Sequence, residues 1–323
     1  MTQTPHFRLI IDQYDKKIPF VVVTHGECAD GAFASYVSSQ GLINLGFRIS
    51  LHIDYFHNTD NFSHCIDQLK NKYILFLDVT PLLDDYIKIK SIGAIISIID
   101  HHPPNFKDGQ IVRLFDQFEK DRCNYLLVTD RTHCATTLAC SVFDQELLKN
   151  SLINHINLFD NCVFDDPVTV SIAAYNKSHL HDIQFCEKAL KKPLNEIIKE
   201  GYEFQSQINK KVKSLITKGK KYSVDIKQLD KSVEIMEILI DDELLSNSIA
   251  EEFYKHNSNA QIIITIFHSK NGTKFSFRSV ENPTGITAST LAQLIGGGGH
   301  PHCSAFFYAN EYMNTFLQVL KNK

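Results

Sequence analysis

Two apolar runs, the second with a single serine in it, constrain the fold of this 323-residue chain more than any other feature. One covers residues 73–77 and stops at Asp78, and the other covers residues 94–99 and stops at Asp100. Apolar runs of this length are typical of the central strands of a parallel sheet, which are buried on both faces. The sequence therefore predicts a parallel sheet with helices on both sides.

Flanking segments extend the same pattern. Strand-like stretches occupy residues 20–24 and 48–56, and helical stretches occupy residues 32–40, 60–70 and 82–89. Strands that alternate with helices indicate βαβ units. We therefore expect an α/β fold whose N-terminal part is a doubly wound parallel-sheet domain.

Polar side chains fall at or just past the predicted ends of these strands. They are His25, Asp30, Asp78, Asp100 and His101. In open α/β sheets, ligands bind at the edge formed by the carboxyl ends of the strands. Because these residues come from separate segments of the sequence, their common placement predicts a functional site at that edge.

The second half of the chain is organised differently. A lysine-rich stretch at residues 187–221 has apolar residues at every fourth position (Phe204, Ile208, Val212 and Ile216), which predicts an amphipathic connecting helix. Beyond it, we expect strands at 233–240, 262–267, 274–278 and 303–309 and a helix at 289–295. These elements divide the chain into an N-terminal domain (1–185), a linker helix (186–220) and a smaller C-terminal α/β domain (221–323).

The composition of the chain argues against some classes of binding partner. The formal net charge is −4, so the chain has no basic surplus with which to hold a long nucleic-acid duplex by counterion release. No segment approaches the roughly 18 consecutive apolar residues of a membrane span. The eight cysteines form no CxxC pair, which favours free thiols in a reducing cytoplasm over a zinc ribbon or a disulfide framework.

The triplet Asp100-His101-His102 ends the second apolar run. One imidazole of such a pair can bind a metal ion while the other faces a substrate; a solvated turn is the alternative. Asp78 ends the first run, where a carboxylate is costly unless it is paired or metal-bound. A helix cap or a hydrogen bond to a loop is the alternative for Asp78.

The turn at residues 24–31 offers a second pair of ligands. His25 and Asp30 lie five residues apart after a strand and can converge on one ion, while Gly31 allows backbone geometry that a residue with a Cβ would resist. The alternative is a strand-to-helix turn with Asp30 as its N-cap. Imidazole and carboxylate ligands suit Mn²⁺ or a similar ion, and two clustered metals are the usual device for cleaving phosphate esters.

A run of four glycines, residues 296–299, precedes His300 near the end of the chain. Glycine leaves backbone N–H groups unshielded, so that such a run can curl around an anion, and His300 could add a donor to a phosphate. A flexible loop is the alternative. The position of the run between a predicted helix and a predicted strand favours the anion site.

Together, these motifs resemble those of the DHH phosphoesterases, in the branch that has a C-terminal DHHA1 domain and includes oligoribonucleases of the nanoRNase type. The shared motifs are the His25…Asp30-Gly31 turn, the strand end at Asp78, Asp100-His101-His102, and the segment Gly297, Gly298, Gly299 and His300. The stretch Phe275–Ser279 resembles the strand of this family that carries a substrate-facing arginine, here Arg278. The resemblance spans about residues 18 to 310.

The resemblance implies a binuclear Mn²⁺ site between the two domains, with Mg²⁺ or Co²⁺ as alternatives. Asp78 would bridge the two ions and His25 would hold one of them. Asp30, His101 and Asp160 would hold the other.

The resemblance also implies the groups that act on the substrate. Asp100 would orient His101, and His102 would face the scissile phosphate. Arg278 and the segment Gly297–His300 would bind the terminal phosphate or sugar of the substrate. The N-terminal domain would thus be catalytic and the C-terminal domain would bind the substrate.

One position departs from the Asp-x-Asp-Gly motif of the family. Cys28 stands where the first aspartate is expected, two residues before Asp30. The adjacent Glu27 could replace the missing carboxylate. Alternatively, a thiolate of Cys28 could bind the metal and shift its preference toward softer ions.

The function that the resemblance implies is metal-dependent hydrolysis of short oligonucleotides or dinucleotides to mononucleotides. Two alternatives stay open: a pyrophosphatase or polyphosphatase built on the same first domain, and a non-enzymatic nucleotide-binding protein. RNA, DNA and cyclic dinucleotides are all candidate substrates. The family includes monomers and dimers, so a homodimer stays open as well.

Overall fold

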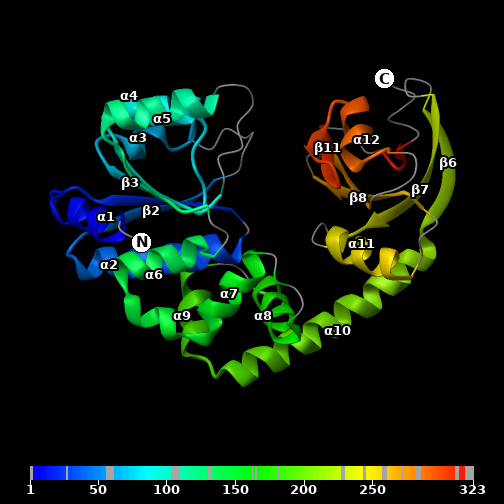
Figure 1. Ribbon diagram of the computed structural model, residues 1–323, viewed down its shortest axis with the longest axis horizontal. Helices are drawn as coiled ribbons and strands as arrows, with labels where there is room; N and C mark the ends of the chain where they lie inside the picture. Colours follow the sequence, from blue (N-terminus) through cyan, green and yellow to red (C-terminus); the bar gives the residue numbers. More distant parts are fainter. Residues whose placement is uncertain are drawn as a thin grey trace. The chain divides into compact units, whose positions relative to one another are not determined.

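A computed structural model gives the architecture of the chain (Figure 1). It describes all residues except 1–2, 27, 56–61, 103–109, 130–131, 162, 164–165, 180–181, 227–229, 243–244, 257–259, 271, 281–284, 310–312 and 317–323. The chain forms two compact units, Met1–Phe204 and Gln205–Lys323. The division falls within helix α10 (Leu194–Lys218), inside the range expected for the linker.

The first unit is built on a five-stranded sheet in which all neighbouring strands are parallel (Figure 1). The strands are β1 (Phe20–His25), β2 (Ile49–Tyr55), β3 (Tyr73–Leu77), β4 (Ile95–Asp100) and β5 (Asn124–Leu127), in the spatial order β2-β1-β3-β4-β5. The predicted parallel sheet and its first four strands are confirmed. Strand β5 escaped prediction because it is short, lies at the sheet edge and is only half buried.

Helices cover both faces of this sheet. In chain order they are α1 (Gln3–Asp12), α2 (Ala29–Asn44), α3 (Ile66–Leu69), α4 (Leu83–Ser91), α5 (Gln110–Asp121), α6 (Ala135–Phe143), the 3-10 helix η1 (Gln145–Lys149), α7 (Ser151–Asp160), α8 (Pro167–Lys177) and α9 (Ile183–Lys191), followed by the start of α10. Among the described residues, no helix is both long enough and apolar enough to cross a bilayer.

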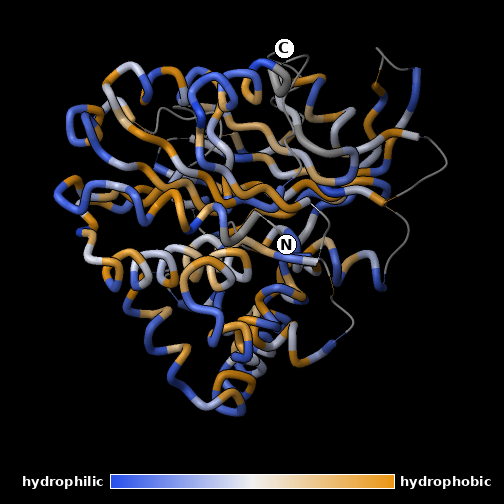
Figure 2. The backbone as a smooth tube through the Cα atoms, turned by 60° about the vertical axis from the view of Figure 1, so that its left-hand side comes forward, coloured by the Kyte–Doolittle hydropathy of each residue, from blue (hydrophilic) through white to orange (hydrophobic). Residues whose placement is uncertain are grey.

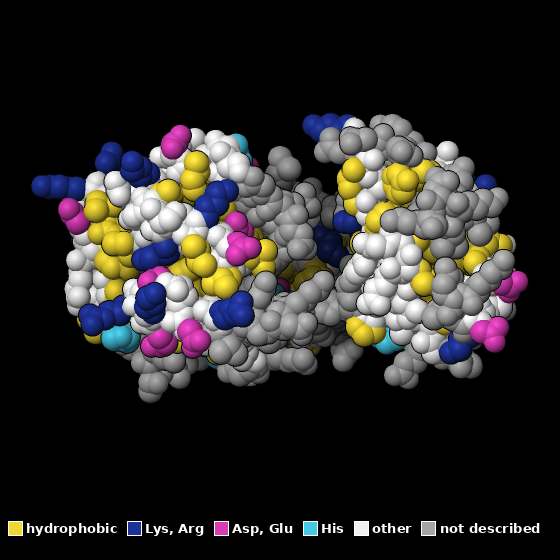
Figure 3. Space-filling view, turned by 90° about the horizontal axis from the view of Figure 1, so that it is seen from above, with side chains coloured by type: hydrophobic (Ala, Val, Ile, Leu, Met, Phe, Trp, Pro, Cys, Tyr) yellow, Lys and Arg dark blue, Asp and Glu magenta, His cyan; other side chains and the backbone are white. Residues whose placement is uncertain are grey.

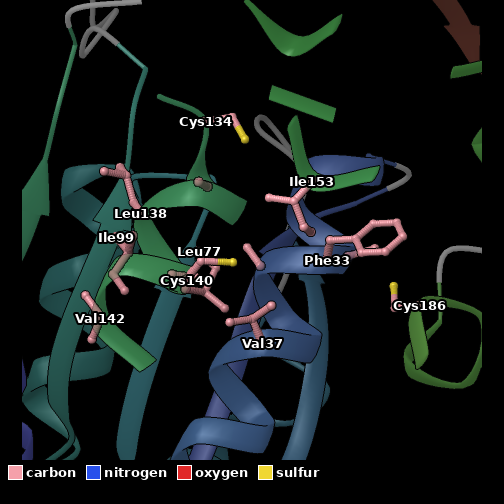
Figure 4. Packing of buried hydrophobic residues seen from close by; sticks show 14 of the residues in the cluster. Phe33, Val37, Leu77, Ile99, Cys134, Leu138, Cys140, Val142, Ile153 and Cys186 are labelled. Atoms are coloured by element: carbon pink, nitrogen blue, oxygen red, sulfur yellow. The ribbon is translucent and has the colours of Figure 1, made fainter. Parts of the chain in front are cut away.

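Strand β3 shows why its apolar run is continuous. Leu77 points to one face and packs in a cluster with Phe33 of α2 and Leu138 of α6 (Figure 4). Phe76 points to the other face and packs in a cluster with Tyr86 of α4. Figure 2 shows the resulting hydrophobic stretches along the strands. Because both faces are buried, the predicted doubly wound arrangement is confirmed.

The second unit contains a six-stranded sheet in the order β10-β11-β9-β8-β7-β6. Its strands are β6 (Lys220–Ile226), β7 (Lys231–Ile240), β8 (Ile262–Ser269), β9 (Gly272–Ser279), β10 (Gly298–His300) and β11 (Cys303–Ala309). Strands β7 and β8 are parallel, and the other neighbouring pairs are antiparallel. The predicted smaller α/β domain is therefore confirmed, although β6 and β10 were not predicted.

Two helices that follow α10 in the chain pack on this sheet, one on each face. On one face, Phe277 belongs to a cluster with Leu291 of α12 (Ala288–Leu294). On the other, Ile263 clusters with Ile249 of α11 (Leu245–His256) and with Val212 of α10. Helix α11 was not predicted. Figure 3 shows acidic and basic side chains interspersed on the visible face of the first unit.

Candidate metal centre

Histidine and aspartate side chains of the first unit converge at the carboxyl edge of its sheet. His25 ends β1, Asp78 follows β3, and Asp100, His101 and His102 end and follow β4. Asp30, in the first turn of α2, and Asp160, the last residue of α7, join them. The structure therefore brings together the imidazole and carboxylate groups that the sequence singled out in this half of the chain.

Asp78 lies at the centre of the cluster. Its side chain is only 1% exposed, and its backbone adopts a left-handed conformation with φ of 61°. This conformation costs an aspartate on the order of 1 kcal/mol and persists only where the surroundings impose it. Burial and the charge of Asp30 raise the pKa of Asp78 well above its usual range. A bound cation would remove this destabilisation.

His101 connects the carboxylates of the centre. Its Nε2 atom lies 2.9 Å from Oδ2 of Asp160, 3.3 Å from Oδ1 of Asp78 and 3.7 Å from Oδ2 of Asp30. Burial acts to lower the pKa of His101, but the neighbouring carboxylates of Asp160 and Asp78 outweigh it and raise this pKa to about 11. The surrounding negative charge thus favours a cation at the position of the imidazole tip.

Three overlapping groups of side chains could hold metal ions, and within each group the ligand atoms lie within 4.8 Å of one another. The groups are His25, Cys28 and Asp78; Asp78, His101 and His102; and Asp30, His101 and Asp160. Oδ1 of Asp78 and Nε2 of His101 are buried, and neither has a hydrogen bond of normal geometry within the described part of the chain. Buried donors of this kind fit a divalent cation with nitrogen and oxygen ligands.

Asp30 is held by a helix that the sequence did not connect with it. Its carboxylate accepts hydrogen bonds from the backbone N–H groups of Ala135 (2.7 Å) and Thr136 (2.8 Å), in the first turn of α6. The N-terminus of a helix favours a negative charge, so this contact orients the Asp30 carboxylate. Asp30 is not the N-cap of its own helix, because Cys28 occupies that position.

Asp100 orients His102 in this structure, whereas the resemblance had assigned it to His101. Its Oδ1 atom accepts hydrogen bonds from Nδ1 of His102 (2.9 Å) and from the backbone N–H of His101 (2.8 Å), and Oδ2 accepts one from Thr80 (2.7 Å). The hydrogen bond with Asp100 raises the pKa of His102. Because Nδ1 donates to the carboxylate, Nε2 of the half-exposed ring is left for other partners.

Gly31 permits the close packing of this edge. A Cβ atom at Gly31 would lie 2.9 Å from the carbonyl oxygen of His25 and 3.4 Å from Oδ2 of Asp78. The glycine is therefore required by close approach, and it allows α2 to pass directly over the end of β1.

Cys28 lies within the centre, and the alternative ligand Glu27 lies outside the described residues. Burial, followed by the charges of Asp78 and Asp30, raises the pKa of the Cys28 thiol well above its usual range. The thiol is therefore neutral in the metal-free protein.

Sequence reasoning missed Asn157, which anchors the helix turn that carries Asp160. Its Oδ1 atom accepts a hydrogen bond from the backbone N–H of Cys134 (2.7 Å), and its Nδ2 donates to the carbonyl of Thr132 (3.1 Å). These bonds tie the last turn of α7 to the start of α6, the helix that binds Asp30. An asparagine inside a helix has no distinctive sequence signal for such a role.

In the second unit, Arg278 lies on β9 and is half buried. Its Nε donates a hydrogen bond to Oδ1 of Asn247 on α11 (2.9 Å), and a terminal nitrogen donates to the carbonyl of Phe277 (2.9 Å). In the sheet register, Cys303 pairs with Arg278 on one side and with His300 on the other. The arginine and the end of the glycine segment thus share one row of the sheet.

The glycine segment does not form the expected loop, in which the backbone N–H groups would be free to surround an anion. The N–H of Gly296 donates to the carbonyl of Gln293 (3.1 Å) and that of Gly297 to Ala292 (2.8 Å), so both cap the end of α12. Gly296 has φ of 88°, the left-handed conformation that this cap requires. Gly298, Gly299 and His300 form edge strand β10, paired with β11.

Three solved structures share this fold, although no family model and no curated protein matches the sequence. A DHH domain protein, described as a member of a family of ribosomal proteins, is 14% identical, with a TM-score of 0.61 over 99% of this chain and 88% of that one. An exopolyphosphatase-related protein from Bacteroides fragilis is 13% identical, with a TM-score of 0.54 over 99% of this chain and 94% of that one. CDC45 from Entamoeba histolytica is 11% identical, with a TM-score of 0.50 over 99% and 97%. At these identities the shared property is the architecture, and this chain has the fold of the DHH-domain proteins.

Proposed function

We propose that this chain is a metal-dependent phosphodiesterase that hydrolyses short oligonucleotides or dinucleotides to mononucleotides. The observation that supports this most strongly is the position of Asp78. This buried carboxylate belongs to two groups of ligand atoms, one with His25 and Cys28 and the other with His101 and His102. A carboxylate shared between two such groups suits a bridge between two ions.

The first unit would supply the ligands of both ions. We propose that His25 and Asp78 hold one ion, and that Asp78, Asp30, His101 and Asp160 hold the other. Two divalent ions, Mn²⁺ or alternatively Mg²⁺ or Co²⁺, would supply Lewis acidity for a water nucleophile and for the phosphoryl oxygens. Hydrogen bonds from the first turn of α6 orient the carboxylate of Asp30, and a hydrogen bond from Cys134 to Asn157 anchors the helix that carries Asp160.

His102 is the side chain that we propose acts on the substrate. Its side chain is 53% exposed, while its Nδ1 donates to the buried carboxylate of Asp100. This pairing fixes the ring and supports a positive charge on it. We propose that Nε2 of His102 contacts the scissile phosphate and holds or delivers the proton needed by the leaving oxygen.

The second unit would recognise the end of the substrate. Arg278 offers a guanidinium, a group suited to phosphate oxygens, and His300 occupies the same row of the sheet in the hairpin of β10 and β11. A single arginine and a short hairpin can contact only a short substrate, so they fit a short oligonucleotide better than a long nucleic-acid strand. The net charge of −4 agrees with this limit.

A second candidate substrate is polyphosphate or pyrophosphate. The similar protein from Bacteroides fragilis is named as related to exopolyphosphatases. The same cluster of metal ligands would serve hydrolysis of a phosphoanhydride, so the substrate has to be decided by assay.

A product assay tests the proposal. The purified protein is incubated with MnCl₂ and, in parallel, an RNA dinucleotide, an RNA pentamer, a cyclic dinucleotide, pyrophosphate and polyphosphate. We expect mononucleotides from the RNA substrates, with loss of activity in His101→Ala and full activity in the matched variant His6→Ala, which changes an exposed histidine of α1. Phosphate release from pyrophosphate or polyphosphate alone would support the second candidate. Nucleotide binding without turnover would contradict both.

A further inference from the structure

The two proposed metal positions differ in chemistry, and the difference comes from Cys28. We propose that the thiolate of Cys28 is a ligand, and that the position formed by His25, Cys28 and Asp78 selects a borderline or soft divalent ion such as Zn²⁺ or Co²⁺ over Mn²⁺ or Mg²⁺. This inference rests on the metal centre of the proposed function. It adds to that function an assignment of a different ion preference to each position.

The geometry supports a ligand role for the thiol. Sγ of Cys28, a ring nitrogen of His25 and a carboxylate oxygen of Asp78 lie within 4.8 Å of one another. The three residues come from the end of β1, the start of α2 and the end of β3, so their convergence is a product of the fold. Asp78 is buried, and its Oδ1 lies 3.3 Å from Nε2 of His101 without a hydrogen bond of normal geometry, so the carboxylate stands between this group and the group that contains His101.

Helix capping does not account for the cysteine. Cys28 is the N-cap residue of α2, with the extended backbone that such a position requires (φ −117°, ψ 134°), but its side chain makes no capping hydrogen bond of normal geometry, and the nearby backbone N–H of Gly31 has only a minor influence on the pKa of the thiol. Serine, threonine, aspartate and asparagine are the residues that stabilise an N-cap. The thiol faces the imidazole and carboxylate of the centre instead.

The chemistry of the donor sets separates the two positions. Sulfur, nitrogen and oxygen donors together favour Zn²⁺ and Co²⁺, because thiolate is a soft ligand. The group of Asp30, His101 and Asp160 contains no sulfur and suits harder ions such as Mn²⁺. On binding, the Cys28 thiol loses its proton to solvent and the sulfur lone pair forms the metal bond, so that charge balances without any redox step.

The test is the ultraviolet-visible spectrum of the full-length protein loaded with Co²⁺ after removal of metals. A cobalt–thiolate bond gives a charge-transfer band in the near ultraviolet, which nitrogen and oxygen ligands do not. We expect the band in the wild type and in the matched variant Cys303→Ser, which changes an exposed cysteine of β11. We expect it to disappear in Cys28→Ser and in Cys28→Asp, with circular dichroism as the control for folding.

The same variants give a second readout. In competition between Zn²⁺ and Mn²⁺, Cys28→Asp should shift the relative affinity toward Mn²⁺ by roughly ten-fold or more, because a carboxylate replaces the soft ligand. A wild-type protein that binds Co²⁺ without the band, or a band that persists in Cys28→Ser, would overturn the assignment. Failure of Co²⁺ to bind at all would also overturn it.

These outcomes are separate from those of the proposed function. Hydrolysis of RNA by the Mn²⁺-loaded wild type, together with a missing cobalt–thiolate band, would reject the role of Cys28 alone. A band that depends on Cys28, together with no turnover of any substrate, would reject the hydrolase and keep the thiolate site.

Discussion

The two units of the molecule place their candidate functional residues by different rules. In the first unit, loops at one edge of a parallel sheet bring together carboxylates and imidazoles from β1, β3, β4, α2 and α7. In the second unit, Arg278 and His300 share one row across a mixed sheet. The first arrangement concentrates negative charge and suits cations, whereas the second displays a positive group and suits an anion.

This difference predicts how substitutions in each unit affect the protein. Asp30, Asp78 and Asp100 are each 1% exposed, so a change at any of them acts in a low-dielectric environment where charges interact strongly. Arg278 is half buried, and its guanidinium donates a side-chain hydrogen bond to the neutral amide of Asn247. We therefore expect large effects on metal binding in the first unit and effects on substrate affinity in the second.

The largest effect is expected from Asp78→Asn, which keeps the shape of the side chain and tolerates the left-handed backbone. Loss of the shared carboxylate should lower kcat by about a thousand-fold or more. The same change should raise the melting temperature of the metal-free protein, because it removes a buried charge beside Asp30. Assays with Mn²⁺ and thermal unfolding with a chelator measure both, with the exposed Asp84→Asn as control. A metal-free variant less stable than the wild type would contradict this account of the centre.

The next effect tests the second unit. Arg278→Ala should raise KM by roughly ten- to a hundred-fold, because a charge-assisted contact with phosphate is lost, while the metal content stays unchanged. Arg278→Lys should recover part of the loss, since it keeps the charge without the planar fork. Lys274→Ala, on the same strand, is the matched control. A loss of bound metal in Arg278→Ala would show that the two units do not divide the work in this way.

A smaller effect on metal affinity is expected from Asn157→Ala. Without the amide, the last turn of α7 loses its bonds to Cys134 and Thr132, so that Asp160 is less well positioned. Metal affinity should fall by roughly ten-fold, in the range of other supporting contacts around metal ligands. Calorimetric titration with Mn²⁺ measures this, and Asn154→Ala, an exposed asparagine of the same helix, is the control. Equal affinities in the two variants would remove Asn157 from the site.

The smallest expected effect is the pH dependence of stability in the metal-free protein. The pKa of His101 rises from 6.5 to about 11 on folding, and that of Asp78 rises as well. A group whose pKa is higher in the folded state binds its proton more tightly there, and this stabilises the folded protein. The stabilisation is complete at a pH below the pKa of the unfolded state, and it is lost as the pH rises toward the pKa of the folded state. Thermal unfolding with a chelator should therefore give a lower melting temperature at about pH 9 than at about pH 6.5. The difference should shrink in His101→Ala; an unchanged difference would assign it to other groups.

The sequence predicted the strands best where burial leaves a continuous pattern. Strands β3 and β4 are recognisable because both of their faces are buried, so apolar residues fill β3 and nearly all of β4 before Asp100. Strand β6 was missed because its pattern contains exposed lysines at an edge, and β10 because three residues rich in glycine carry no periodicity. Helix α11 was missed although one of its faces packs on the second sheet.

The candidate site was predicted in its membership and only partly in its contacts. His25, Asp30, Asp78, His101 and Asp160 could be named from motifs, because strand ends of a parallel sheet meet at one edge. The partner of Asp100 could not, since the choice between His101 and His102 depends on which ring turns toward the carboxylate. The amides that hold Asp30 come from α6, more than a hundred residues away in the chain.

The sequence by itself thus determined which residue types stand at the sheet edge, since periodicity and strand ends are local properties of the chain. Only the tertiary structure decided how those residues are used. It turned Asp100 toward His102, joined Asp30 to α6, gave Asp78 its left-handed backbone and directed the glycine amides to the end of α12. The physical reason is that hydrogen bonds and burial between distant segments depend on three-dimensional packing, which no local pattern encodes.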